Sequence, residues 1–382
     1  MKRVYLDYAA ATPIEAEVAV AMQNAVANFA NPAAAYTSAR LAKTELDKHR
    51  KTLAMFIGAN SDEIVFTSGA SESNNLAILG AARKKGKGEI ISALSEHSSV
   101  REPLKQLEKE GFIVHWCRVD NQGRIDKTQF KQLLHTNTIL VTLSLANSEY
   151  GTIEDITGLV EIVREFEKEQ KSKVLFHTDA SAAAMVNNCS VSRLGVDLLT
   201  LSSAKLYGPN GIGLVYVRRG SAIQPQIFGG KQENSLRAGT ESGFLLAGFA
   251  RAIEIVLQKR KDDEKHFREL YSKLTDYFKT KNVVINGDSK HRLYSLLSVS
   301  FRNINGEDLV AYLDSKGFEV STGAACEVSN QTPSTALLAL GRTKKEAQGS
   351  LRISFGRTTT SNDIMAFTNA LEETLTILES QQ

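Results

Sequence analysis

Short apolar runs alternate with helix-length segments through the first two thirds of the chain. Runs such as "EIVFTS", "TILVTLSLA", "KVLFHTD" and "VDLLTLSS" are rich in β-branched and aliphatic residues and end in small polar ones. Strands that alternate with helices in this way are typical of a doubly wound α/β fold with a mostly parallel sheet. Near residue 243 a long helical stretch leads into a smaller α+β segment. We expect a large domain over residues 15–250 and a small domain built from residues 1–14 and 251–382.

The charge of the chain is nearly balanced, with 46 basic and 43 acidic residues and a net charge of +3. This balance argues against direct binding of nucleic acid. No apolar run reaches the roughly 18 residues of a membrane span. The three cysteines, Cys117, Cys189 and Cys326, are too few and odd in number for a disulfide framework. We therefore expect a cytoplasmic protein with reduced thiols that binds neither membrane nor nucleic acid.

Polar residues follow the ends of five predicted strands. They are residues 68–71, 96–98, 147–149, 179–181 and 202–205. Because ligands bind at the carboxyl ends of strands in open α/β sheets, we expect these residues to meet in one crevice. Lys205 is then placed to form a Schiff base with a carbonyl cofactor, although a surface turn is the usual position of a lysine.

Five other residues have side chains suited to a cofactor or an amino-acid substrate. Asp179 can keep the nitrogen of a pyridine cofactor protonated, or it can cap a helix. Ser71 lies in a glycine-containing turn that opens a helix, and such turns bind phosphate. His97 can stack on a cofactor ring or be an ordinary hydrogen-bonded side chain. Arg352 suits a carboxylate ligand or a surface ion pair, and Cys326 suits an accessible nucleophile or a small buried side chain.

The ordered set of motifs resembles the cysteine desulfurases, which are pyridoxal-phosphate enzymes of the class V aminotransferase family. The resemblance extends over nearly the whole chain, from "YLDYAAATP" through "FTSGASESNN", "EHSSV", "NSEYGTI", "HTDAS", "AKLYGPNGIG" and "GGKQENSLRAGTES" to "GAAC" and "SLRISFGRTTT". It implies the α/β fold of the fold-type I pyridoxal-phosphate transferases, whose large domain has a mostly parallel seven-stranded sheet flanked by helices. It implies no metal site.

The resemblance also implies a role for each matched residue. Lys205 is expected to bind pyridoxal 5'-phosphate covalently, and Cys326 in the small domain is expected to take the sulfur as a persulfide, with His97 completing the catalytic set. The residues implied in cofactor binding are Ala70, Ser71, His97, Ser148, Asp179, Ser202, Lys205 and Thr240, and those implied in substrate binding are Asn31, Asn147 and Arg352. Thr240 matches a threonine that reaches the cofactor phosphate of the neighbouring subunit, which implies a homodimer.

The implied reaction converts L-cysteine to L-alanine and passes the sulfur to an acceptor protein, such as an iron–sulfur scaffold or a tRNA-thiolation enzyme. Four positions depart from the family pattern, since Ala204, Ala182, Ser148 and Tyr36 stand where the family usually has histidine, glutamine, asparagine and histidine. We expect these changes to remove contacts with the cofactor and weaken its binding. Two other functions stay open: a pyridoxal-phosphate enzyme acting on another amino acid, such as selenocysteine, and a cofactor-poor paralogue that serves as a binding subunit.

Overall fold

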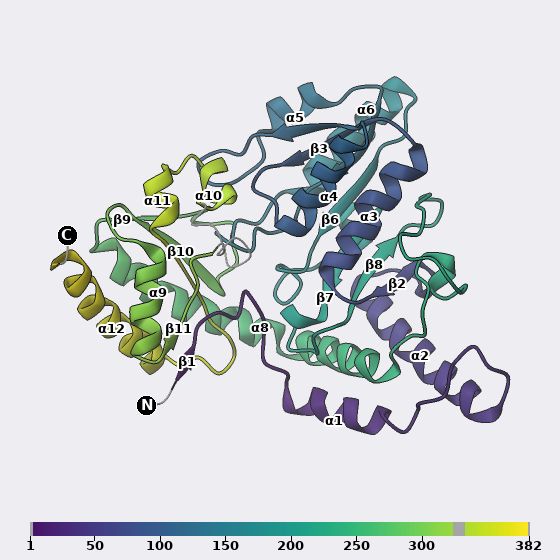
Figure 1. Ribbon diagram of the computed structural model, residues 1–382, viewed down its shortest axis with the longest axis horizontal. Coiled ribbons are helices and arrows are strands. Elements are labelled where there is room, and N and C mark those ends of the chain that lie inside the picture. The colour runs from purple at the N-terminus through teal and green to yellow at the C-terminus, as the bar shows by residue number, and fades with distance from the viewer. Residues whose placement is uncertain (1–2, 324–332, 381–382) are drawn as a thin grey trace.

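A seven-stranded sheet forms the larger of two parts in the computed structural model, which describes residues 3–323 and 333–380 (Figure 1). The strand order is β2-β8-β7-β6-β5-β3-β4, and β8 runs antiparallel to both of its neighbours. The strands are β2 (Ile64–Thr67), β3 (Glu89–Ala93), β4 (Ile113–Cys117), β5 (Thr138–Thr142), β6 (Leu175–Asp179), β7 (Leu198–Ser202) and β8 (Gly213–Val217). The prediction of a mostly parallel seven-stranded sheet is confirmed.

Helices cover both faces of this sheet. One face carries α3 (Ala70–Lys85) and α4 (Ser98–Lys109), and the other carries α2 (Thr37–Phe56), α5 (Lys127–Leu133), α6 (Ile156–Gln170), α7 (Val191–Leu194) and the first half of α8 (Gly243–Lys279). In β7, Leu198 belongs to the core under α3, whereas Leu199 belongs to the core on the opposite face. Burial on both faces explains why these strands are apolar in nearly continuous runs.

The remaining elements of the larger part are short, except for α1 (Ala16–Ala25), which packs on α8. The short 3₁₀ helices are η1 (Ser61–Glu63), η2 (Ser203–Lys205) and η3 (Glu233–Ser235). None of the helices within the described ranges has both the length and the hydropathy that crossing a membrane requires.

The smaller part contains the C-terminal third of the chain and the first strand, so that both termini lie on the same side of the molecule (Figure 1). Its three-stranded antiparallel sheet has the order β12-β10-β9, and β1 pairs in parallel with β11. The elements are β1 (Val4–Tyr5), β9 (Val283–Ile285), β10 (Leu296–Phe301), α9 (Gly306–Ser315), β11 (Phe318–Glu319), α10 (Thr335–Ala339), α11 (Lys344–Gln348), β12 (Ser350–Ser354) and α12 (Ser361–Ser380). Since α8 runs unbroken through residue 250, a domain boundary at that residue stays a prediction.

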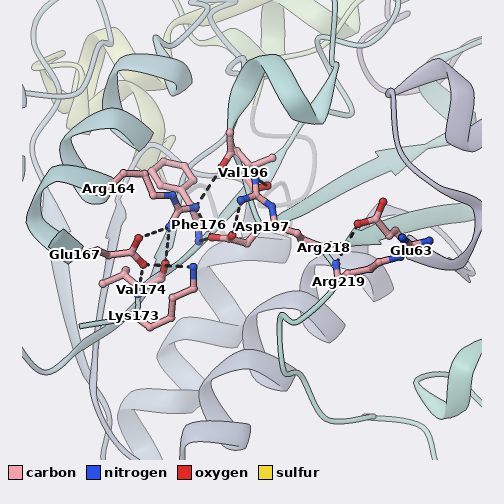
Figure 2. Close-up of polar contacts among 11 residues, drawn as sticks. Glu63, Arg164, Glu167, Lys173, Val174, Phe176, Val196, Asp197, Arg218 and Arg219 are labelled. Carbon is pink, nitrogen blue, oxygen red and sulfur yellow. Dashed lines mark hydrogen bonds and ion pairs between the residues drawn. The ribbon is translucent and has the colours of Figure 1, made fainter. Parts of the chain in front are cut away.

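A buried ion-pair network fixes the beginnings of β6 and β7 (Figure 2). Asp197 is fully buried, and its Oδ2 accepts hydrogen bonds from Arg164 Nη2 at 2.6 Å and from the backbone nitrogen of Phe176 at 2.8 Å. Its Oδ1 lies 3.4 Å from Arg218 Nη1, just beyond the end of β8. Arg164 also donates to the carbonyl oxygen of Val174. One carboxylate therefore ties three neighbouring strands together.

We expect Asp197→Asn to lower the free energy of unfolding by about 3 kcal/mol, because it keeps the shape of the side chain but removes the charge that two arginines share. Urea unfolding of the variant and the wild type measures this difference. The control is Asp62→Asn, which breaks the exposed ion pair with Arg219 at 2.7 Å and should barely move the unfolding midpoint. Equal effects of the two substitutions would contradict a special role for Asp197.

Candidate active site

A cavity of about 380 Å³ lies at the carboxyl ends of the parallel strands. Its volume falls within the usual range of small-molecule sites. All five polar segments predicted to meet in a crevice contribute to its wall. The predicted site residues that line it are Ala70, Ser71, His97, Asn147, Ser148, Asp179, Ser202, Lys205 and Arg352. A larger cavity, of about 700 Å³, is lined by other, mostly charged residues and includes none of these.

Among the described residues, Asn31, Tyr36 and Thr240 do not line this cavity. Cys326 lies outside the described residues. Asn31 and Thr240 are both exposed, and Thr240 instead lines a separate cavity with Phe29. Tyr36 is 56% exposed and does not line the cavity of its own chain, and the expected loss of a cofactor contact at this position stays a prediction. The other three departures, Ala182, Ser148 and Ala204, do line it.

The turn after β7 presents Lys205 to the cavity. Lys205 Nζ donates to the carbonyl oxygens of Ala9 at 2.7 Å and Ala10 at 2.5 Å. Two residues later the backbone of Tyr207 is left-handed, with φ of 61°, a conformation that is costly for a residue with a bulky side chain. Thr12 supports this turn, because its Oγ1 accepts from the Tyr207 nitrogen at 2.7 Å and donates to the carbonyl oxygen of Ala204 at 3.0 Å. Residues 9–12 thus clamp the lysine turn from the N-terminal side.

A buried side-chain amide links two further residues of the cavity wall, Asp179 and His97. Asn74, on α3, donates through Nδ2 to Asp179 Oδ2 at 2.8 Å and to Ser99 Oγ at 2.9 Å. The hydroxyl of Ser99 in turn lies 2.8 Å from His97 Nδ1. Asn74 and Ser99 are not among the site residues predicted from the sequence, although Asn74 lies one helical turn beyond Ala70 and Ser99 two residues beyond His97. Together they fix the carboxylate and the imidazole relative to each other.

Burial sets the protonation of the groups around this network. It lowers the pKa of His97, and the nearby Asp179 carboxylate opposes this shift. His97 Nδ1 accepts from the backbone nitrogen of Ser99 at 3.1 Å, so the neutral ring carries its hydrogen on Nε2. Burial raises the pKa of Glu96 to about 7, against hydrogen bonds from Ser144. The imidazole is therefore a neutral group with a hydrogen to donate.

Arg352, on β12, brings a positive charge from the smaller part of the molecule to the cavity wall. It is buried, and its Nη2 donates to Asp7 Oδ1 at 2.7 Å while its Nη1 donates to the carbonyl oxygen of Ser148 at 3.2 Å. Its Nε has no hydrogen-bond partner among the described residues. Each terminal nitrogen of the guanidinium keeps a second N–H, and because Arg352 lines the cavity, a carboxylate ligand can use these donors.

Asn147 lines the cavity, but its amide is already engaged in shaping the loop. Its Nδ2 donates to the carbonyl oxygen of Ser95, and its Oδ1 accepts from the backbone nitrogens of Glu149 and Tyr150. These hydrogen bonds hold the loop between β5 and α6 against the end of β3.

The chain belongs to the aminotransferase class-V family, whose model matches residues 4–367. It is 41% identical to the cysteine desulfurase IscS of Dictyoglomus turgidum, over 97% of this chain and 94% of that protein. It is 39% identical to the cysteine desulfurase IscS of Neisseria meningitidis serogroup C, over 94% of this chain and 89% of that protein.

Solved structures show the same likeness. A NifS-like protein superposes with a TM-score of 0.91 at 33% identity, over 98% of this chain and 100% of that chain. SspA in complex with cysteine superposes with a TM-score of 0.81 at 32% identity, over 93% of this chain and 99% of that one.

The residues of the cavity fit pyridoxal phosphate, the cofactor of this family. Lys205 supplies an amine and Asp179 a carboxylate on the same cavity wall. The first backbone N–H groups of α3 begin after Gly69, where an added Cβ would meet no atom within 4 Å, so a phosphate has open space at the helix N-terminus. The hydroxyl of Ser181 is buried in the wall and has no hydrogen-bond partner among the described residues, which leaves it for a polar ligand.

We expect Ala204→His to tighten cofactor binding about tenfold to a hundredfold, because it returns a hydrogen-bond donor beside a charged ligand. Titration of the apoenzyme with pyridoxal phosphate, followed by absorbance, measures the dissociation constant. Ala204→Phe is the matched control, since it fills similar space without a donor and should not tighten binding. An unchanged dissociation constant in Ala204→His would contradict the idea that this alanine costs a cofactor contact.

Proposed function

We propose that the chain is a pyridoxal-phosphate-dependent cysteine desulfurase. The observation that supports this best is a single cavity shared by Lys205, Asp179, His97 and Arg352. The relatives named cysteine desulfurase match nearly the full length of the chain, and one similar structure, SspA, was solved with cysteine.

Each of these side chains has a task that its surroundings support. When bound, the cofactor supplies an electron sink that stabilises negative charge at the substrate α-carbon. Asp179, held by Asn74, keeps the proton on the pyridine nitrogen. Arg352 binds the substrate carboxylate through the N–H groups of its guanidinium that no residue in the described part of the chain uses. Lys205 Nζ moves the proton at the α-carbon, and His97 Nε2 carries a hydrogen that it can donate in the same cavity.

The sulfur transfer needs a thiol nucleophile, and we assign it to Cys326 from the motif "GAAC". Its thiolate forms a bond to the substrate sulfur while the carbon–sulfur bond of cysteine breaks. The carbon takes up a proton and leaves as alanine, and the sulfur stays on Cys326 as a persulfide. We further propose that an acceptor thiol, on an iron–sulfur scaffold or a tRNA-thiolation enzyme, takes this sulfur in the cytoplasm.

We also propose that the enzyme is a homodimer. Phe29 is 90% exposed, Val26 is 63% exposed, and both line a cavity with Thr240. Large apolar side chains that are this exposed and adjacent favour burial against a partner. A second copy covering this surface brings Thr240 toward a neighbouring site, which agrees with the role that the family resemblance implies.

Purified protein with pyridoxal phosphate, L-cysteine and a reductant should release alanine and sulfide in equal amounts. We expect Lys205→Ala to slow alanine release at least about 100-fold, and Cys326→Ala to form no persulfide. The control is Cys189→Ala, because burial raises the pKa of the Cys189 thiol to about 12 and excludes it as a nucleophile. Absence of alanine with the wild type would overturn the proposed function, and full activity of Cys326→Ala would overturn the assigned nucleophile.

Light scattering should give twice the chain mass of 41.8 kDa for the wild type. Phe29→Glu should shift the protein toward the monomer and weaken cofactor binding, because a charge in a buried interface is costly. Met365→Glu, on α12 and 60% exposed, is the control and should leave the mass unchanged. A monomeric wild type would contradict the dimer without bearing on the chemistry.

A further inference from the structure

Three side chains with metal-binding atoms converge at the far edge of the seven-stranded sheet, away from the cavity. His115 Nε2 lies 2.6 Å from Glu89 Oε2, and His135 Nδ1 lies 2.8 Å from the same oxygen. The ligand atoms of all three residues lie within 4.8 Å of one another. The two imidazole rings stand edge to face with centroids 5.5 Å apart. Two ring nitrogens thus point at one carboxylate oxygen from different directions.

The fold holds these residues in place through its backbone. Glu89 begins β3 and pairs with Ile113 in the parallel ladder, so His115, two residues further along β4, shares its face of the sheet. The turn that carries His135 is closed by Thr138, whose Oγ1 accepts from the His135 nitrogen at 2.9 Å. The Glu89 nitrogen donates to the carbonyl oxygen of Asn137 at 2.9 Å, which fixes this turn to β3.

A glycine makes this close approach possible. A Cβ on Gly88 would lie 2.6 Å from Ile139 Cγ2 and 3.0 Å from the carbonyl oxygen of Asn137. Any larger residue would push the 135–138 turn away from Glu89. The three side chains are therefore brought together by strand pairing and by a tight backbone contact, and their meeting does not depend on long surface loops.

The chemistry of the cluster matches one class of ligand. Two imidazole nitrogens and one carboxylate oxygen form a donor set that suits zinc and its first-row neighbours, whereas magnesium and calcium prefer oxygen alone. The side chains of Glu89 and His115 are 13% and 23% exposed, and that of His135 is 50% exposed, so the site is open on one side.

We propose that Glu89, His115 and His135 form a binding site for a divalent first-row transition ion of the Zn²⁺ type. The ligands are His115 Nε2, His135 Nδ1 and a carboxylate oxygen of Glu89, and water completes the coordination on the open side. Ligand atoms around zinc lie about 3.3 Å apart, so the contacts of 2.6 and 2.8 Å open by about half an ångström when the ion enters. Each neutral ring then carries its hydrogen on its other nitrogen. The bound ion links β3, β4 and the turn before β5.

Calorimetric titration of the full-length, tag-free, cofactor-loaded protein with Zn²⁺ tests this site. The Cys326→Ser background removes a thiol that could itself bind zinc. We expect this parent to bind one ion per chain. His135→Gln should weaken the affinity for Zn²⁺ more than about 100-fold, because losing even a residue that only hydrogen-bonds to a metal ligand lowers metal affinity 10- to 100-fold. Co²⁺ in place of Zn²⁺ should give a visible ligand-field absorption that the same substitution abolishes, and Mg²⁺ should not compete.

The matched control is His291→Gln, because His291 is an exposed histidine that belongs to no such group among the described residues. It should bind Zn²⁺ like the parent. Glu89→Gln is the second variant, and it should lose the ion even if His135→Gln disturbs its turn. A parent that binds no Zn²⁺, or variants at Glu89 and His135 that bind it as the parent does, would overturn the proposal and leave only a hydrogen-bonded cluster.

Discussion

The geometry of the site depends on one buried carboxylate, that of Asp197. It lies directly before β7 and accepts a hydrogen bond from Phe176 in β6 (Figure 2). This end of the two strands is opposite the carboxyl ends that line the cavity. The other ends of these two strands carry Asp179 and the turn to Lys205. Because the side-chain period of a strand is two, a slip of one residue would turn these groups to the wrong face of the sheet. The contact made by Asp197 specifies the register that brings them together.

A buried charge is an energetically costly way to specify the register of two strands. Burying an ion pair contributes little compared with well-packed apolar side chains, whereas removing one partner is strongly destabilising. An apolar residue at position 197 could fill the space, but it could not accept hydrogen bonds from an arginine and a backbone nitrogen at once. The network therefore favours one register over its neighbours, and that register is what the cavity needs.

Much of the fold and the site could be predicted from the sequence, because both follow from local patterns. Continuous apolar runs gave buried parallel strands, and the rule that ligands bind at strand ends gathered Lys205, Asp179 and His97 into one cavity. Asn74 could not be predicted as a site residue, because nothing in the sequence around an asparagine inside a helix indicates that it will contact Asp179. Contact between Arg352 and Asp7 joins residues 345 positions apart, and no periodicity encodes such a pair. The role of Thr240 at a neighbouring subunit and the substrate-binding role of Asn31 stay predictions.

The departures from the family pattern fall on residues expected to bind the cofactor, whereas the residues assigned to the reaction itself are kept. Ala204 and Ala182 line the cavity at positions where the family resemblance implies hydrogen-bond donors to the cofactor, and we expect the loss of these donors to weaken cofactor binding. Lys205, Asp179 and Arg352, to which we assign proton transfer and the orientation of charge, all line the cavity. The unpartnered hydroxyl of Ser181 offers a donor beside Ala182, so part of the lost contact can be made from a neighbouring position. We expect a chain with these changes to lose cofactor affinity before it loses catalytic competence, so that its activity depends on the concentration of free cofactor.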